Sequence, residues 1–311
     1  MKLSLVVPCY NEAENIKLFQ DAAIQTFSKC DYDYEIVFID DGSTDATMLE
    51  LRKAFQEQRC PVKVVSFSRN FGKEAGIYAG IQHAKGDYIC IIDADLQQRP
   101  EVVRDMVYQL EEHPQYDIIA AYQDRRGESK TLSFFKKSFY RIINLLSDIT
   151  LKADASDFRT FRRNVAESIL TMGEYHRFSK GIFGWVGYNT CYIPYTACPR
   201  AAGTTKWSFR KLLNYAIEGI IGYSTKPLRI ATFTGITTAA AALIYLVIVV
   251  LQKLISGIDI PGYATIIVLI LFLGGMQLFC LGIIGEYIGK VFEQSKHRPI
   301  YLAKEVLDYN K

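Results

Sequence analysis

The sequence lacks the features of several common classes of protein. Its formal net charge is only +3 over 311 residues, which is too small to indicate binding to nucleic acid. Its seven cysteines form no Cys-x-x-Cys pair and no spacing typical of a metal site, so we interpret them as reduced packing residues of a protein that faces the cytosol. The first apolar run, residues 3–7, is too short for a signal peptide and predicts a β-strand.

Apolar residues make up 50% of the chain, but they are concentrated in two long runs toward its C-terminal end. Residues 230–251 and 263–288 each provide roughly 20 or more positions with almost no charge, enough to cross about 30 Å of hydrocarbon as a helix. The alternative is a buried helical hairpin in a soluble protein, although such helices are usually shorter. We therefore predict two transmembrane helices.

Charged residues beside these runs predict their orientation. Lysine and arginine gather before the first run and after the second, whereas the connecting loop offers only Lys253 and Asp259. Positive charge favours the cytoplasmic side, so we expect an integral protein of the cytoplasmic (inner) membrane with the N-terminal domain and both termini in the cytoplasm. Glycines from Gly274 to Gly289 predict close helix contact, either within the hairpin or in a homo-oligomer.

Residues 1–228 have the mixed composition of a globular domain. Short runs rich in valine and isoleucine, at residues 3–7, 35–40, 62–67 and 88–93, are typical of strands buried on both faces, and residues 118–121 predict a further strand. Helical patterns separate them at residues 12–28, 45–58 and 73–84. This alternation predicts an α/β fold with a doubly wound, mainly parallel sheet. Residues 131–147 predict an amphipathic helix that either lies on the membrane surface or packs in the core.

Polar clusters follow four of the predicted strands. They are Pro8-Cys9-Tyr10-Asn11-Glu12, Asp40-Asp41-Gly42-Ser43-Thr44-Asp45, Ser68-Arg69-Asn70-Phe71-Gly72-Lys73 and Asp93-Ala94-Asp95-Leu96-Gln97. Any single residue among them could be a helix cap. Ligands of open α/β sheets bind outside the carboxyl ends of the strands, so four clusters at one edge predict a single binding site.

The residue types in these clusters favour a nucleoside diphosphate and a metal ion. Asp93 and Asp95 lie two apart at a strand end and could share Mg²⁺ or Mn²⁺, which prefer carboxylate oxygens and would be completed by a diphosphate. Lys73 opens a helix after Gly72, where a lysine and free amides can meet phosphate. Asp41 could accept hydrogen bonds from a base or a ribose. The alternative for Asp93 and Asp95 is that they are turn residues only.

These clusters resemble the motifs of glycosyltransferase family 2 enzymes with a GT-A fold. Ser156-Asp157-Phe158-Arg159, the Arg200-x-x-Gly203-x-x-Lys206 element and the two C-terminal apolar runs are similar to the polyisoprenyl-phosphate glycosyltransferases, the branch of bactoprenol glucosyltransferases and dolichyl-phosphate mannose synthases. The resemblance covers essentially the whole chain. It implies inverting transfer of a single hexose from a nucleotide sugar, UDP-glucose as a first expectation, to a polyprenyl phosphate.

The resemblance also implies three parts of the chain and a role for each cluster. The parts are a cytoplasmic catalytic domain (1–228), a transmembrane hairpin (229–289) and a cytoplasmic C-terminal tail (290–311). The residues expected to bind the nucleotide sugar are Pro8, Tyr10, Glu12, Asp41, Lys73 and Asp93, and those expected to hold the metal are Asp93, Asp95 and Gln97. Gln98-Arg99 departs from the acid and proline that often follow in relatives.

Asp157 matches the family's proposed catalytic base. The acceptor is a phosphate monoester with a second pKa of roughly 6, so a base is less necessary than for a sugar hydroxyl. Asp157 could instead orient the acceptor or the sugar, or form a structural ion pair with Arg159.

A polyprenyl tail keeps the acceptor in the bilayer, so its phosphate is expected at headgroup level. The cations expected to bind it are Arg126, Lys136, Lys137, Arg200 and Lys206. For each of them, attraction to anionic lipid is the alternative. The aromatic residues between Phe183 and Tyr195 are either core residues or an interfacial belt.

Two other functions fit the fold less well. A processive polysaccharide synthase would resemble proteins with a Gln-x-x-Arg-Trp motif and more membrane helices than this chain has. A non-catalytic membrane protein that binds sugar nucleotides is opposed by the intact Asp93, Asp95, Gln97 and Asp157.

Overall fold

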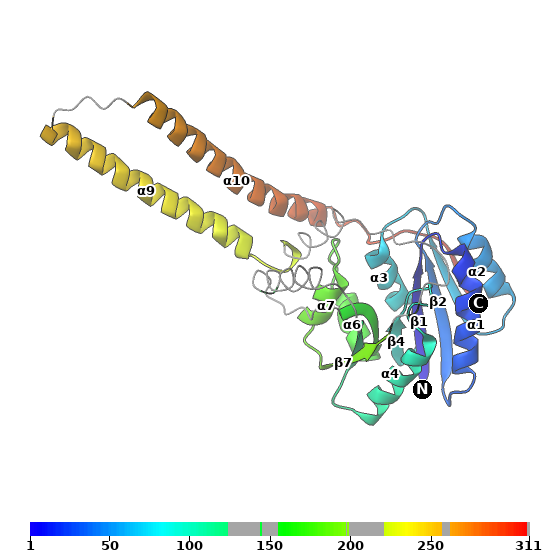
Figure 1. The fold of residues 1–311 in the computed structure, drawn as a ribbon. Helices are drawn as coiled ribbons and strands as arrows, with labels where there is room; N and C mark the ends of the chain where they lie inside the picture. The colour runs from blue at the N-terminus through cyan, green and yellow to red at the C-terminus, as the bar shows by residue number, and fades with distance from the viewer. Residues whose placement is uncertain (124–143, 145–154, 197, 199–220, 257–261, 310–311) are drawn as a thin grey trace.

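The computed structural model describes residues 1–123, 144, 155–196, 198, 221–256 and 262–309. These residues form an α/β domain from which two long helices project side by side (Figure 1).

One sheet of eight strands forms the centre of the domain. Its strand order is β7-β5-β6-β4-β1-β2-β3-β8. The strands are β1 (Lys2–Cys9), β2 (Asp33–Asp40), β3 (Val62–Phe67), β4 (Tyr88–Ile91), β5 (Ile118–Gln123), β6 (Ala155–Arg162), β7 (Thr190–Tyr195) and β8 (Ala303–Asp308). The four central strands pair in parallel, and β6 and β8 are antiparallel to their neighbours. The predicted mainly parallel sheet is confirmed.

Helices cover both faces of this sheet because its strands are apolar on both sides. One face packs against α1 (Ala13–Phe27), α2 (Thr47–Gln56) and α4 (Pro100–Glu112). The other packs against α3 (Lys73–His83), α6 (Arg163–Thr171) and α7 (Ser179–Trp185). In β1, Leu5 and Val6 are both fully buried and belong to the clusters on opposite faces. This is the doubly wound arrangement expected from the sequence.

The C-terminal part differs from the prediction in two ways. The expected boundary at residue 290 falls inside α10 (Tyr263–Ser295), and β8 adds the expected tail to the catalytic sheet beside β3. β8 is a short edge strand, Ala-Lys-Glu-Val-Leu-Asp, in which half of the residues are charged and no continuous apolar run marks a central strand. It is held by Asp308, which pairs with the buried Lys63 at 3.2 Å, and it brings both ends of the chain to the same side of the hairpin.

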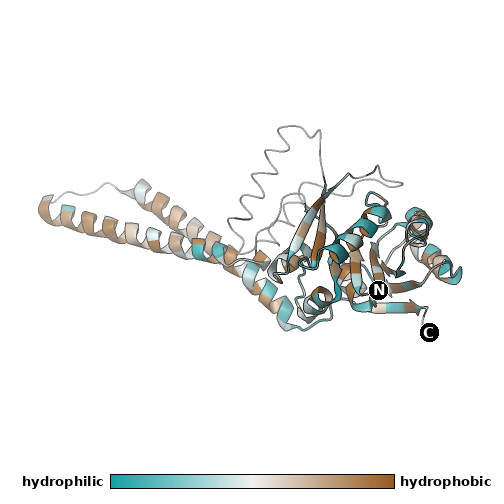
Figure 2. Ribbon diagram, turned by 90° about the horizontal axis from the view of Figure 1, so that it is seen from below, coloured by the Kyte–Doolittle hydropathy of each residue, from teal (hydrophilic) through white to brown (hydrophobic). Residues whose placement is uncertain are grey.

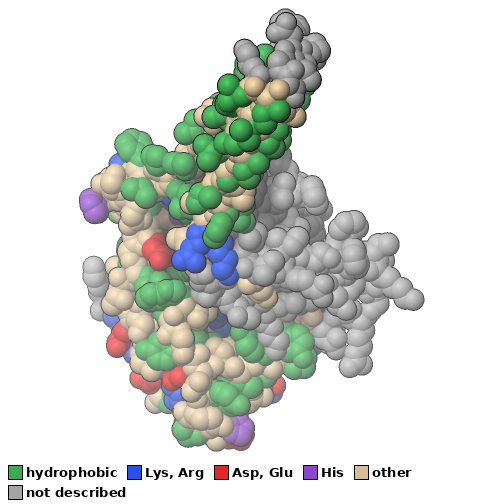
Figure 3. Space-filling view, turned by 90° about the vertical axis from the view of Figure 1, so that its left-hand side faces the viewer, with side chains coloured by type: hydrophobic (Ala, Val, Ile, Leu, Met, Phe, Trp, Pro, Cys, Tyr) green, Lys and Arg blue, Asp and Glu red, His purple; other side chains and the backbone are tan. Residues whose placement is uncertain are grey.

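The two predicted apolar helices are confirmed and are longer than expected. They are α9 (Lys226–Ser256) and α10, and their most apolar stretches are not buried within the protein. Figure 2 shows that hydrophobic residues, drawn in brown, occupy much of the length of both helices. Lysine and arginine side chains gather where the helices meet the domain (Figure 3). By length and composition, each helix can span a membrane.

The glycines of α10 do not pack against α9. Among the described residues, apart from each glycine's chain neighbours and the nearby backbone of α10 itself, no heavy atom lies within 4 Å of a Cβ built on Gly274, Gly275, Gly282, Gly285 or Gly289. Of the two roles predicted for this stripe, contact within the hairpin is therefore not seen, and contact in a homo-oligomer stays a prediction. The predicted amphipathic helix, residues 131–147, lies outside the described residues apart from Asn144.

Candidate active site

The loops after β1 and β2 are joined by side chains of the predicted clusters. The Asn11 carboxamide oxygen accepts the Thr44 N–H at 2.9 Å, and the Asn11 N–H donates to the Ser43 hydroxyl at 3.0 Å. Asn11 itself has a left-handed backbone, with φ of 54°, a conformation that asparagine adopts more readily than most residues. The sequence places these clusters at one edge of the sheet, and the structure brings them into contact.

Asp41, in the loop after β2, is hydrogen-bonded to the loop after β3. Its carboxylate accepts the Phe71 N–H at 2.6 Å and the Gly72 N–H at 2.9 Å. Burial raises the pKa of this carboxyl above its ordinary value, against the lowering effect of the two amides. This structural role was not foreseen from the sequence. The expected contact with a nucleoside stays a prediction, since each carboxylate oxygen can accept a further bond.

Gly42 permits the same two loops to lie close together. Its φ is +65°, and a Cβ at this position would lie 2.4 Å from the backbone carbonyl carbon of Arg69. A side chain would therefore have to displace the loop that carries Lys73.

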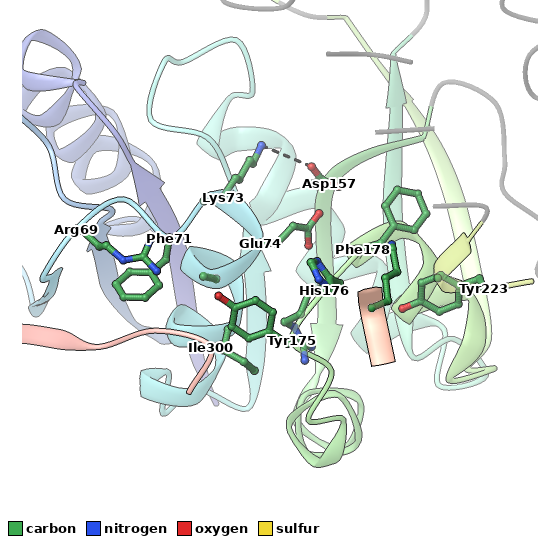
Figure 4. Close-up of a pocket in the computed structure, with 15 residues that line it drawn as sticks. Arg69, Phe71, Lys73, Glu74, Asp157, Tyr175, His176, Phe178, Tyr223 and Ile300 are labelled. Carbon is green, nitrogen blue, oxygen red and sulfur yellow. Dashed lines mark ion pairs between the residues drawn. The ribbon is translucent and has the colours of Figure 1, made fainter. Parts of the chain in front are cut away.

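Lys73 joins the predicted metal cluster to the predicted catalytic residue. Its Nζ lies 2.7 Å from Asp93 Oδ1 and 3.6 Å from Asp157 Oδ2. Strand register explains the convergence: β6 runs antiparallel to β4 with Arg159 opposite Ile91, so Asp157 and Asp93 both lie just beyond the paired region at the same edge. Figure 4 shows the Lys73 and Asp157 side chains pointing toward each other.

Charged groups around Asp157 keep it ionised. Burial acts to raise the pKa of Asp157, but the positive charges of Lys73, Lys180 and Arg159 outweigh it and hold the pKa below the ordinary value. The Arg159 guanidinium donates to the Ser156 carbonyl at 3.0 Å and stacks 4.1 Å from the Phe183 ring centroid. The alternatives left open by the sequence for Asp157, including a structural ion pair with Arg159, stay predictions.

Glu74 is a second carboxyl beside this group, and sequence reasoning missed it. It accepts hydrogen bonds from the backbone and the hydroxyl of Ser179, which connect α3 to the start of α7. Burial, followed by the negative charge of Asp157, raises the pKa of Glu74 to about 7. The residue follows Lys73 directly in a motif that the sequence analysis had already singled out, which is the signal that could have found it.

Gln98 holds Asp93 in place. Its side-chain oxygen accepts the Asp93 N–H at 3.0 Å, and its Nε2 donates to Asp93 Oδ2 at 3.3 Å. The turn between them has Leu96 in a left-handed conformation, with φ of 58°, and Asp95 Oδ1 accepting the Gln97 N–H at 3.1 Å. Gln98 was noted in the sequence only as a departure from relatives, and its structural role could not be read from that.

The predicted metal ligands suit a divalent cation whose other coordination positions are occupied by oxygens of the substrate. Among the described residues, no group of three or more histidine, cysteine, aspartate or glutamate side chains could hold a metal ion by itself. Asp93 and Asp95 supply two carboxylates at one strand end, which is the number that Mg²⁺ commonly takes from protein beside substrate phosphates. Gln97 also lies there, and its Nε2 donates to the Cys198 carbonyl at 3.3 Å. These residues fit a divalent cation bound together with a diphosphate.

The other predicted residues are distributed as follows. Pro8, Tyr10 and Glu12 lie at the same edge of the sheet, at and after the end of β1, with Tyr10 exposed and Glu12 accepting a hydrogen bond from the Asn15 side chain at 2.6 Å. Phe183 is a core residue, whereas Trp185 is exposed. The predicted phosphate-binding cations lie outside the described residues: Arg126, Lys136, Lys137, Arg200 and Lys206.

Comparison with known protein families identifies the family to which this chain belongs. The profile of glycosyl transferase family 2 matches residues 4–170, more than half of the chain. The chain belongs to glycosyltransferase family 2. A second profile, described as the GtrB C-terminal hairpin, matches residues 226–291, which span α9 and most of α10. The family predicted from the motifs is confirmed, and the protein is a glycosyltransferase.

Relatives align with this glycosyltransferase along its whole length. The putative glycosyltransferase CsbB of Bacillus subtilis is 41% identical over 99% of this chain and 93% of its own. A prophage bactoprenol glucosyl transferase homolog of Escherichia coli is 40% identical over 98% and 99%. The bactoprenol glucosyl transferase of Shigella phage SfV is 38% identical over 98% of both chains.

Solved structures support the fold. Mannosyl-3-phosphoglycerate synthase from Rubrobacter xylanophilus superposes with a TM-score of 0.51 over 70% of this chain and 71% of its own, at 14% identity. The predicted GT-A-type fold is confirmed.

Proposed function

We propose that this enzyme transfers one hexose, in the first instance glucose, from a nucleotide sugar to a polyprenyl phosphate at the cytoplasmic face of the membrane. The observation that carries the proposal is the contact of Lys73 with both Asp93 and Asp157, in a domain fastened to two membrane-type helices. Two relatives that align along nearly the whole chain are named as a bactoprenol glucosyl transferase and a homolog of one. Their names support a polyprenyl phosphate as the acceptor and glucose as the sugar.

On the donor side, Asp93, Asp95 and Gln97 would hold a divalent cation, Mg²⁺ or Mn²⁺, and the edge formed by Pro8, Tyr10, Glu12 and Asp41 would hold the nucleoside. Bound there, the cation would offset the charge of the departing nucleoside diphosphate. Lys73 adds a positive charge beside the same phosphates. Gln98 supports this arrangement because it fixes the orientation of Asp93.

On the acceptor side, an oxygen of the lipid phosphate forms a new bond to C1 of the hexose. The bond from C1 to the diphosphate oxygen breaks, and the nucleoside diphosphate leaves with the electron pair, so the configuration at C1 inverts. The phosphate monoester is largely ionised at neutral pH, since its second pKa is roughly 6. Asp157 therefore acts by orienting the sugar or the acceptor rather than by removing a proton.

The chain's topology supports the proposed arrangement in the membrane. β8 lies in the same sheet as β1, so both ends of the chain are on the side of the catalytic domain, as two crossings require. The excess of lysine and arginine there supports the cytoplasmic side of the inner membrane. Arg126, Lys137, Arg200 and Lys206 remain proposed as cations among those that bind the lipid phosphate, and a homo-oligomer is proposed from the glycines of α10.

A transfer assay with radiolabelled sugar tests the proposal. Purified full-length protein is incubated with Mn²⁺, a polyprenyl phosphate and UDP-, GDP- or TDP-hexoses, and lipid products are separated. A lipid that carries one sugar, labile to mild acid, is the expected product. Asp95→Ala should abolish it while the protein stays folded in the membrane fraction. A long polymer would indicate a processive synthase, and no product with any donor would indicate a non-catalytic protein.

A further inference from the structure

A cavity of about 430 Å³ lies where α10 joins the catalytic domain. Lys73 and Asp157 line it, whereas Asp93 and Asp95 do not. Figure 4 shows Lys73, Glu74 and Asp157 at the cavity together with aromatic side chains from other segments. The Lys73–Asp157 ion pair therefore borders both the donor site and this cavity.

The loop between α6 and α7 lines the cavity and is attached to α10. Gln294 accepts the Tyr175 N–H at 2.8 Å and donates to the Gly173 carbonyl at 3.0 Å. His176 contacts Glu293 of the same helix. Lys290 also lies on α10 and lines the cavity itself. The cavity thus lies beside the end of a helix that is long and apolar enough to cross the membrane.

Positive charge predominates in the cavity lining. The charged lining residues, apart from His176, are the cations Arg69, Lys73, Arg177 and Lys290 and the carboxyls Glu74 and Asp157. Among them, Lys73 pairs with Asp93 and Asp157, and Arg69 stacks 4.0 Å from the Phe71 ring centroid.

Arg177 and Lys290 are not used by the donor-site contacts described above. One N–H of Arg177 donates to the Met172 carbonyl at 2.6 Å, and its guanidinium lies 4.5 Å from the Tyr78 ring centroid. A guanidinium held in this way loses little freedom when it binds a phosphate, and it has further N–H groups with which to do so. Lys290 reaches the same cavity from the membrane helix.

The rest of the lining is apolar and aromatic. Phe71, Phe178, Tyr175, Tyr223 and Ile300 contribute rings and methyl groups beside the cations. A ligand with an anionic head joined directly to a hydrocarbon chain matches both parts of this lining, because the cations suit the head and the rings suit the first carbons of the chain.

We propose that this cavity receives the acceptor, with Arg177 and Lys290 binding its phosphate and the aromatic residues binding the first isoprene unit. The inference rests on the proposed function. It places the acceptor on one side of Lys73 and Asp157 and the nucleotide sugar on the other. The two residues form the shared boundary across which the hexose passes.

Steady-state kinetics with farnesyl phosphate as the acceptor test this assignment. Lys290→Gln removes one cation from a half-buried position and should raise the KM for farnesyl phosphate roughly tenfold or more, since it removes a charge-assisted hydrogen bond. Arg177→Gln should raise it at least as much. The dissociation constant of the nucleotide sugar should change less than about twofold in both, which also reports that each variant is folded. Lys296→Gln, at the exposed C-cap that follows the same helix, is the matched control and should leave the KM unchanged.

Three results would overturn the assignment. The first is a KM for farnesyl phosphate that neither variant changes while wild type makes the lipid product, in which case the proposed function stands without this site. The second is an equal rise in Lys296→Gln, which would indicate general attraction to the membrane. The third is that the two substitutions weaken only the binding of the protein to phosphatidylglycerol vesicles, which would mean that the cavity binds the headgroups of bulk lipids. No lipid product from wild type with any donor would overturn both this inference and the proposed function.

Discussion

Replacing Lys73 by glutamine tests the link between the two halves of the site. The amide can still donate a hydrogen bond, but the positive charge between Asp93 and Asp157 is lost. At 3.6 Å and an effective dielectric constant of about 20, the attraction between Lys73 and Asp157 would be about 4–5 kcal/mol. The Lys73 side chain is 44% exposed, so solvent screening reduces this attraction to about 1 kcal/mol.

The sign of this shift follows from the charge that is removed. Lys73 is the first of the cations that hold the pKa of Asp157 below its ordinary value against the effect of burial. Without it the pKa of Asp157 rises, so a higher pH is needed to ionise Asp157 and the acidic limb of kcat/KM moves to higher pH. Measuring kcat/KM for the donor from pH 4 to pH 8 in wild type and Lys73→Gln tests this expectation. Arg69→Gln, in the same loop, should leave the limb in place. An unmoved limb in Lys73→Gln would refute the electrostatic role.

Three further substitutions test the supports of the site and of the sheet. Gln98→Ala leaves the Asp93 N–H without its acceptor, so it should cost about 1–3 kcal/mol in denaturant unfolding and weaken Mn²⁺ activation. Gly42→Ala combines a left-handed backbone with a clash at 2.4 Å and should lower stability by about 2 kcal/mol or more in thermal unfolding. Asp308→Ala removes the partner of Lys63, whose side chain is 2% exposed, and should cost about 3 kcal/mol; no change would show that β8 contributes little.

The central strands and their polar clusters could be predicted from the sequence because parallel strands buried on both faces leave a continuous apolar run. β1 to β4 are such strands, and the residues that follow them converge because parallel strands end at one edge. Asp157 was found only as part of a motif. Its strand, β6, runs in the opposite direction, and the pairing that places it beside Asp93 joins segments more than 60 residues apart.

The residues that hold the site in place were not predictable, because their contacts also depend on the fold. Asp41, Glu74 and Gln98 act through hydrogen bonds whose partners are set by the fold. Asp41 lies 30 residues from Phe71, and Glu74 lies 105 residues from Ser179. Only Gln98 has a near neighbour as partner, and that contact depends on the left-handed backbone of Leu96. Residue types identified what could bind a ligand, but not what holds those residues in place.

The substitution Asp157→Asn tests most directly whether the hexose is transferred across the boundary formed by Lys73 and Asp157. The measurement compares the turnover of UDP-glucose and farnesyl phosphate with the dissociation constant of UDP-glucose in the same purified protein. The account predicts that turnover falls by at least about tenfold while the dissociation constant changes less than about twofold, since Asp157 acts on the reacting groups and not on the nucleotide. Equal losses in turnover and in donor binding would contradict it, and would make Asp157 a structural residue of the donor site.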